Sequence, residues 1–153
     1  MTSQSLLSIL TSVFTSCIEL ISVQTINLLG QDDSMRYDHI PSVIYTNPEV
    51  ATVGETKASA EQKGLAVREI NLPMTYSGRF MAESENGQGF IKLLTDENGS
   101  RVLGVTMVGL YAAEMILAAE MMIDSELNPE KLKKLVFPHP TVGEIMKEAL
   151  FRV

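Results

Sequence analysis

Cysteine, tryptophan and histidine are scarce or missing in this chain of 153 residues. Cys17 is the single cysteine, there is no tryptophan, and the two histidines are His39 and His139. A single thiol excludes an internal disulfide and a multi-thiolate metal site. Two distant histidines give little support for any other metal site. We therefore expect no metal centre, and no disulfide scaffold of the kind found in small secreted proteins.

Positive charge is also in short supply. The chain has 12 Lys and Arg residues against 19 Asp and Glu residues, which gives a net charge of −7. This balance argues against a nucleic-acid partner and against an anionic membrane surface. No basic residue precedes Arg36, so the N-terminal stretch lacks the basic start of a secretory signal peptide. We expect a cytoplasmic location.

Charge is almost absent from the first thirty residues, where Glu19 is the only charged side chain. Signal peptide, transmembrane helix and amphipathic helix are the competing interpretations, but serines and threonines interrupt the apolar run too often for a membrane span. Positions 6, 10, 13, 17 and 20 are apolar at helical spacing, which favours an amphipathic helix. Cys17 lies on that face, so we expect it to be buried rather than reactive. Residues 1–34 are thus predicted to be a helical arm and acidic linker that pack on the domain or on a partner.

The sequence pattern of residues 35–153 is typical of a compact α+β domain. Apolar runs bounded by turn residues predict strands at 42–46, 50–53, 65–72, 90–95 and 101–108, and Asn98-Gly99 is a strong hairpin signal. Helices are expected at 56–63, 112–123 (apolar nearly all round, hence buried), 128–135 and after Thr141, whereas 76–85 looks irregular with a short strand near Phe80. Because no regular helical crossovers separate the strands, we expect an antiparallel sheet of about five strands with helices on one face.

The segment from Phe137 to Glu144 is the best local candidate for chemistry. A residue before proline is pushed out of the helical region, so His139 should be extended, with Pro140 in a first helical turn. Thr141 and Glu144 fit a capping box, with Thr141 as the N-cap. This sharp turn into the helix, the elbow, would bring the Glu144 carboxylate to the His139 ring. The carboxylate would then orient the ring as a general base. Spacing alone leaves open that Glu144 is only a cap partner and His139 an ordinary loop residue.

Other charged or polar residues have weaker claims. His39 follows Tyr37-Asp38 in a linker, and we expect it to be solvated. Arg79 is better explained as part of a solvated loop than as an anion ligand. Glu114 and Glu120 interrupt an apolar helix, and since buried charges are costly unless paired, we expect one to face a dimer seam and the other the solvent.

Several blocks, in order and at consistent spacing, resemble a known family. They are Ile40 to Gly54, Arg101-Val102-Leu103-Gly104 followed by Gly109, Glu114 and Met115, and His139-Pro140-Thr141 with Glu144. Together they are similar to the C-terminal dimerisation domain of the pyridine nucleotide–disulfide oxidoreductases, most closely in their dihydrolipoamide dehydrogenase branch. The resemblance runs from about residue 35 to residue 151.

The resemblance implies a site that two subunits share. In the parent family, electrons pass from dihydrolipoamide through a redox disulfide and FAD to NAD. The residue matching His139 reaches the other subunit's flavin and disulfide as the acid/base for the thiols, and the residue matching Glu144 holds it. The backbone at His139 and Pro140 would border the partner's flavin. The implied partners are a second copy of this chain and an FAD/NAD-domain fragment of the same enzyme.

The chain also departs from the family pattern. Gly87-Gln88-Gly89 is followed by Lys92 where a dinucleotide-binding loop needs its third glycine, and no paired cysteines exist. Phe137 stands where the family often has a second histidine. We therefore expect neither FAD nor NAD to bind this chain alone, and no activity in isolation.

Three functions remain open at this point. The first is an interface domain that supplies the His139–Glu144 acid/base pair to a partner subunit. The second is a stand-alone interaction module in which that pair is idle. The third, a small hydrolase that uses His139 as its base, ranks last because no motif places a nucleophile beside the ring.

Overall fold

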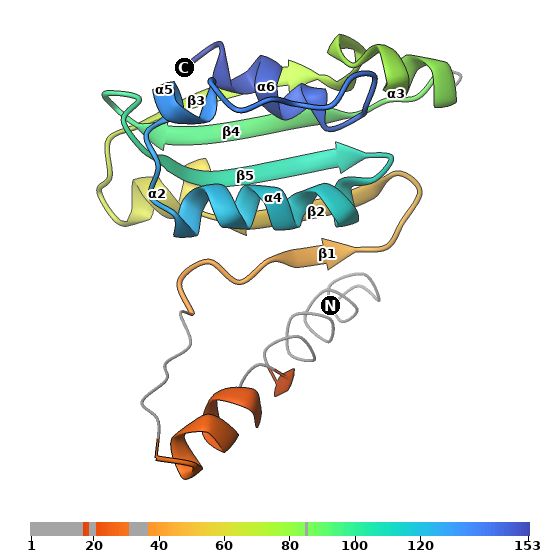
Figure 1. Ribbon diagram of the computed structural model, residues 1–153. Coiled ribbons are helices and arrows are strands. Elements are labelled where there is room, and N and C mark those ends of the chain that lie inside the picture. Colours follow the sequence, from red (N-terminus) through yellow and green to blue (C-terminus); the bar gives the residue numbers. More distant parts are fainter. Residues whose placement is uncertain (1–16, 19–20, 31–36, 85) are drawn as a thin grey trace.

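The computed structural model describes residues 17–18, 21–30, 37–84 and 86–153 (Figure 1). Residues 21–28 are helical, but most positions of the expected apolar face of the arm lie outside the described residues. Cys17 is exposed, so the expectation that it is buried is wrong for the single chain. Among the described residues, no helix is both long enough and apolar enough to span a bilayer.

The described part of the chain forms one five-stranded antiparallel sheet in the order β1-β2-β5-β4-β3 (Figure 1). The strands are β1 (Ser42–Ile44), β2 (Glu49–Gly54), β3 (Val67–Pro73), β4 (Phe90–Asp96) and β5 (Val102–Gly109). The Asn98-Gly99 signal is confirmed, because β4 and β5 pair directly across this turn and Gly99 has a φ of +67°. The α+β class and the five antiparallel strands predicted from the sequence are therefore confirmed.

Helices cover one face of this sheet and enclose the core. Helix α4 (Ala112–Asp124) packs on β2 and β5, and α6 (Glu144–Leu150) packs on β4 and β3. Alternate strand residues point toward these helices and are buried: Ala51, Val53, Ile70, Leu72, Ile91, Leu93, Val105 and Met107. The expectation that α4 is buried holds only for the side that faces the sheet, because on the other side Leu117 is 60% exposed and Met121 is 62% exposed.

Helix α2 (Lys57–Gln62) borders the opposite face of the sheet. With residues of β3, β4 and β5 it encloses a hollow of about 610 Å³ that mixes charged and apolar side chains. The segment that leads into α2 passes very close to β5. Glu55 N donates to the Leu103 carbonyl at 2.8 Å, and a Cβ on Gly104 would lie 1.8 Å from the backbone carbonyl oxygen of Glu55. A glycine is therefore required at 104 for the chain to pass this close to β5.

Residues 74–83 are helical, which corrects the expected irregular segment with a strand near Phe80. They form η1 (Met74–Tyr76) and α3 (Gly78–Glu83). The Ser77 hydroxyl caps α3 by accepting from Phe80 N at 3.2 Å. The Phe80 ring is buried in the core, so tertiary packing adds to the cap in selecting a helix here.

His39 is 6% exposed, so the expectation that it is solvated is wrong. Its Nδ1 lies 3.0 Å from Asp38 Oδ1, and its Nε2 lies 3.3 Å from Asp124 Oδ1 and 3.8 Å from Glu120 Oε1. Asp124 is the last residue of α4, so the ring joins the segment before β1 to the end of that helix. Glu120 thus lies toward His39, whereas Glu114 is exposed.

The core predicts a sharp contrast between two leucine truncations. Leu93→Ala removes a buried side chain from β4 and should lower the free energy of unfolding by about 2–5 kcal/mol, through lost burial and a residual cavity. Leu65→Ala removes a partly exposed leucine just before β3 and serves as the matched control, with an expected loss below about 1 kcal/mol. Urea unfolding of both variants checks this. Equal losses would contradict the assignment of Leu93 to the core.

Candidate functional site

The elbow at residues 137–143 is held from behind by α6. Four residues of this helix are buried against the sheet: Ile145, Met146, Ala149 and Leu150. Val142, just before the helix, is buried as well. These side chains repeat at helical spacing, so one face of α6 is committed to the core and its start cannot rotate freely. The elbow therefore projects from a fixed base.

Three hydrogen bonds shape the elbow itself. The buried Ser77 hydroxyl donates to the Thr141 carbonyl at 3.1 Å. The Thr141 hydroxyl donates to the Pro138 carbonyl at 2.8 Å, and Thr141 N donates to Glu144 Oε2 at 3.1 Å. A single segment is thus tied to α3, to itself and to α6.

The expected capping box is only half present. Helix α6 begins at Glu144 with Gly143 as its N-cap, so Pro140 lies outside the first turn and follows a cis peptide bond. The bond from the backbone of Thr141 to the Glu144 carboxylate is as predicted. The Thr141 hydroxyl, however, is engaged by Pro138 instead of a helix amide, because the chain turns once more before the helix starts.

His139 and Glu144 meet as the sequence predicted. His139 Nδ1 lies 2.6 Å from Glu144 Oε1. An ionised carboxylate can only accept, so Nδ1 carries the proton and Nε2 presents its lone pair outward. The His139 side chain is 79% exposed and that of Glu144 is 21% exposed, so the carboxylate sits behind the ring and the ring faces outward. The arrangement suits a base that acts on a group brought from outside this chain.

The pair changes the acidity of the carboxyl group. The hydrogen bond from His139 lowers the pKa of Glu144, and the amide of Thr141 lowers it further. Glu144 is therefore held ionised, which in turn favours a proton on Nδ1. A carboxylate in this position also stabilises the imidazolium that forms when Nε2 takes up a proton.

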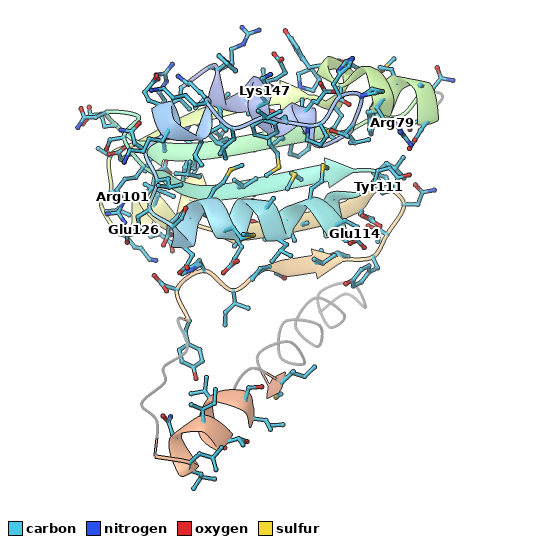
Figure 2. The ribbon with its side chains drawn as sticks, in the orientation of Figure 1. Arg79, Arg101, Tyr111, Glu114, Glu126 and Lys147 are labelled. Carbon is cyan, nitrogen blue, oxygen red and sulfur yellow. The ribbon has the colours of Figure 1, made fainter. Side chains whose placement is uncertain are left out.

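A second polar group lies next to the elbow. Arg79 and Tyr111 border a hollow of about 310 Å³ together with Met115, Thr141, Val142 and Gly143 (Figure 2). Arg79 forms an ion pair with Glu83, and the Tyr111 hydroxyl donates to Glu83 at 2.9 Å. Arg79 thus lies on α3 in an ion pair, where the sequence predicted a solvated loop.

Ser77 and Tyr111 were not predicted from the sequence to be neighbours of the elbow. Ser77 is a favourable N-cap residue, and this signal could have identified α3. No sequence pattern, however, predicts the hydrogen bond from Ser77 to Thr141. Within the described residues, no group of three or more His, Cys, Asp and Glu side chains is placed to hold a metal ion.

The hydrogen bond to His139 makes a measurable prediction for Glu144. His139→Ala should raise the pKa of Glu144 toward the ordinary value, whereas Lys147→Ala, which removes the weakest contribution, should change it little. Because the folded pKa is lowered, stabilisation by the pair is fully present above the ordinary glutamate pKa and is lost as the pH falls through the folded value. Carbon-13 NMR titration of the carboxyl groups checks this. An unchanged pKa in His139→Ala would contradict the pairing.

Comparison with known proteins gives a consistent result. Residues 40–150 match the family model described as the pyridine nucleotide-disulphide oxidoreductase dimerisation domain. The chain is 32% identical over 134 residues to dihydrolipoyl dehydrogenase 1, mitochondrial, of Arabidopsis thaliana, covering 88% of this chain and 25% of that protein. It is 38% identical over 114 residues to dihydrolipoyl dehydrogenase, mitochondrial, of Caenorhabditis elegans, covering 74% and 23%. The chain thus spans about a quarter of the length of these relatives.

Solved structures show the same fold. The HOCl-induced flavoprotein disulfide reductase RclA of Escherichia coli matches with a TM-score of 0.77 at 24% identity, covering 86% of this chain and 31% of that one. LpdA of Mycobacterium tuberculosis matches with a TM-score of 0.74 at 25% identity, covering 83% and 28%. Sheet order, hairpin, elbow and these matches lead to one conclusion: the chain belongs to the pyridine nucleotide-disulphide oxidoreductase family and carries its dimerisation domain, most like that of dihydrolipoyl dehydrogenase.

Proposed function

We propose that this chain is the dimerisation domain of a dihydrolipoamide dehydrogenase-like flavoprotein disulfide reductase, and that it supplies the acid/base pair to a redox centre on another subunit. The observation that carries the proposal is the His139 Nδ1–Glu144 Oε1 contact of 2.6 Å, with its ring 79% exposed. A ring oriented from behind and open in front is arranged for a reactant that arrives from outside.

The chemistry proposed for the pair is proton transfer with a thiol. Nε2 of neutral His139 takes the proton from a dithiol substrate or enzyme thiol, leaving a thiolate, which is the reactive form of sulfur. The charge that appears on the ring is balanced by Glu144, which the fold keeps ionised. In the reverse direction the imidazolium returns the proton to a thiolate. General acid/base catalysis of this kind contributes typically about 10²–10⁴-fold to rate.

The redox groups have to come from elsewhere. The chain has one cysteine, so it cannot form the disulfide that the reaction requires. The hollow next to the elbow holds about 310 Å³ and is bordered by Arg79 and Tyr111, with no glycine-rich loop to bind a pyrophosphate. These residues do not fit a whole FAD or NAD. The proposed function therefore requires redox groups that lie outside residues 1–153, and it predicts no activity for these residues alone.

Self-association is the other half of the proposal. Helix α4 presents Leu117 and Met121 to solvent one turn apart, each more than half exposed. Exposed apolar side chains grouped on the outer side of a helix are typical of an interface. We propose that this face contributes to a homodimer.

A stand-alone interaction module is the second candidate. The same outward face of α4 would serve it. In that case the pair formed by His139 and Glu144 only stabilises the elbow.

Complementation separates the two candidates. The full chain is mixed with an FAD–NAD fragment of a dihydrolipoyl dehydrogenase that lacks its own C-terminal domain, and lipoamide-dependent NAD reduction is measured. We expect the mixture to recover activity that neither part has. His139→Gln should lower it by about 10²–10⁴-fold, and Glu144→Gln should lower it less.

The matched control is Lys57→Gln on α2, an exposed residue remote from the elbow, which should leave the recovered activity unchanged. Recovered activity that survives His139→Gln would refute the acid/base role. Association of the fragments without any recovery would instead support the interaction module.

The dimer surface is tested by light scattering. Leu117→Glu places a charge on the exposed face of α4 and should shift the chain toward monomer by at least about tenfold in dissociation constant, because a buried unpaired charge is costly. Leu65→Glu, at another partly exposed leucine, is the control and should remain dimeric. A wild-type chain that is monomeric at high concentration would rule out the dimer.

A further inference from the structure

The hydroxyl of Ser77 is buried, and both of its hydrogen-bonding roles are occupied. Ser77 lies between η1 and α3 and is 1% exposed. Its oxygen accepts a hydrogen bond from Phe80 N at 3.2 Å, and because an amide can only donate, the hydroxyl proton is left for the Thr141 carbonyl, 3.1 Å away. One small side chain therefore caps a helix and ties it to a residue 64 positions later in the sequence.

Helix α3 is a fixed support for this tie. The Phe80 ring anchors its middle in the core. Before the helix, Met74 is buried and its amide donates to the Gly89 carbonyl at 2.9 Å. At its end, Glu83 accepts from the hydroxyl of Tyr111, the N-cap residue of α4, at 2.9 Å (Figure 2). Because α3 is held along its whole length, the position of the Ser77 hydroxyl is set by the fold.

Thr141 transmits the tie to the acid/base pair. The elbow follows α5 (Pro129–Leu132), and among the described residues no other hydrogen bond reaches residues 137–143 from outside the elbow and α6. The amide of Thr141 donates to Glu144 Oε2 at 3.1 Å, and Glu144 Oε1 lies 2.6 Å from His139 Nδ1. Both carboxylate oxygens are thus engaged, and the orientation of the carboxylate depends on the position of the Thr141 backbone.

We propose that Ser77 is a positioning residue for the proposed acid/base pair. Its hydroxyl fixes the Thr141 backbone, which in turn fixes the Glu144 carboxylate. The oriented carboxylate keeps the proton of the His139 ring on Nδ1, so that Nε2 retains its lone pair for an incoming thiol. The value of this tie for catalysis rests on the proposed function, whereas its effect on the ring is a property of this chain alone.

Nitrogen-15 NMR of the His139 ring in the full chain tests the proposal directly. At alkaline pH, where an exposed imidazole is neutral, the shifts of the ring nitrogens report the ratio of the Nδ1–H form to the Nε2–H form. We expect the Nδ1–H form to dominate in the wild type, and Ser77→Ala to lower the ratio by roughly fivefold, the factor that one net hydrogen bond typically contributes. The pKa of Glu144 should rise toward its ordinary value in the same variant, because its hydrogen bonds to His139 and Thr141 weaken.

The matched control is Thr56→Ala on the opposite face of the sheet. Thr56 caps α2 by accepting from Ser59 N at 3.1 Å, so both substitutions remove the N-cap side chain of a six-residue helix. Only Ser77→Ala also releases the elbow, and Thr56→Ala should therefore leave the His139 ratio unchanged. Ser77→Thr keeps a hydroxyl at the same position and should restore the wild-type ratio. An equal fall in Ser77→Ala and Thr56→Ala would overturn the proposal, because a general loss of stability would then explain both.

Ser77→Asp separates the cap from the tie to Thr141. Aspartate is as good an N-cap as serine, but an ionised carboxylate can only accept hydrogen bonds. This variant therefore keeps the cap of α3 and loses the donor to the Thr141 carbonyl, and we expect the same fall in the His139 ratio as for Ser77→Ala. With the fold confirmed by circular dichroism, a wild-type ratio in Ser77→Asp would overturn the proposal.

Complementation with the FAD–NAD fragment distinguishes this inference from the proposed function. If both are right, Ser77→Ala should lower the kcat of the recovered lipoamide-dependent activity by the same factor of roughly five and leave KM unchanged. A wild-type mixture without activity would refute the proposed function, and the NMR ratio would still decide the role of Ser77. Recovered activity with an unchanged ring ratio in Ser77→Ala would overturn the positioning role and leave the proposed function standing.

Discussion

The packing of α6 against β3 and β4 is the contact on which the rest of the site depends. Ile145, Ala149 and Leu150 are fully buried there, and the helix therefore has one allowed orientation. Glu144 is its first residue, so the direction of the carboxylate is decided by the core and not by the loop. A side-chain pair built on a rigid element, such as the proposed acid/base pair, keeps its geometry without needing a partner to induce it.

His139 points away from this rigid helix toward solvent. The ring is tethered by one nitrogen to Glu144 and exposed on its other side, while Ser77 and Thr141 hold the backbone behind it. A catalytic base used within its own chain is generally enclosed with its reactant, where water is excluded. The exposed His139 ring is not enclosed in this way, which suits the proposed role in a neighbouring subunit.

Among the described residues, two exposed apolar surfaces involve α4. One is the outer side of α4 around Leu117, and the other is the groove at the end of the same helix, near Val136. The first is an exposed helix face, and the second is a hollow of about 360 Å³. The buried His39 ring holds the segment before β1 at the end of this helix.

Local patterns in the sequence determined the strands, the Asn98-Gly99 hairpin and the meeting of His139 with Glu144, because each depends on residues that are near one another in the chain. Tertiary structure alone decided the burial of His39, whose partner Asp124 is 85 residues away, and the tie between Ser77 and Thr141, 64 residues apart. In the 74–83 segment, burial of Phe80 in the core adds to the local cap that Ser77 provides for α3. The local sequence indicates which backbone conformation a segment favours. Only the folded chain shows which residues, distant in sequence, make contacts that stabilise a different one.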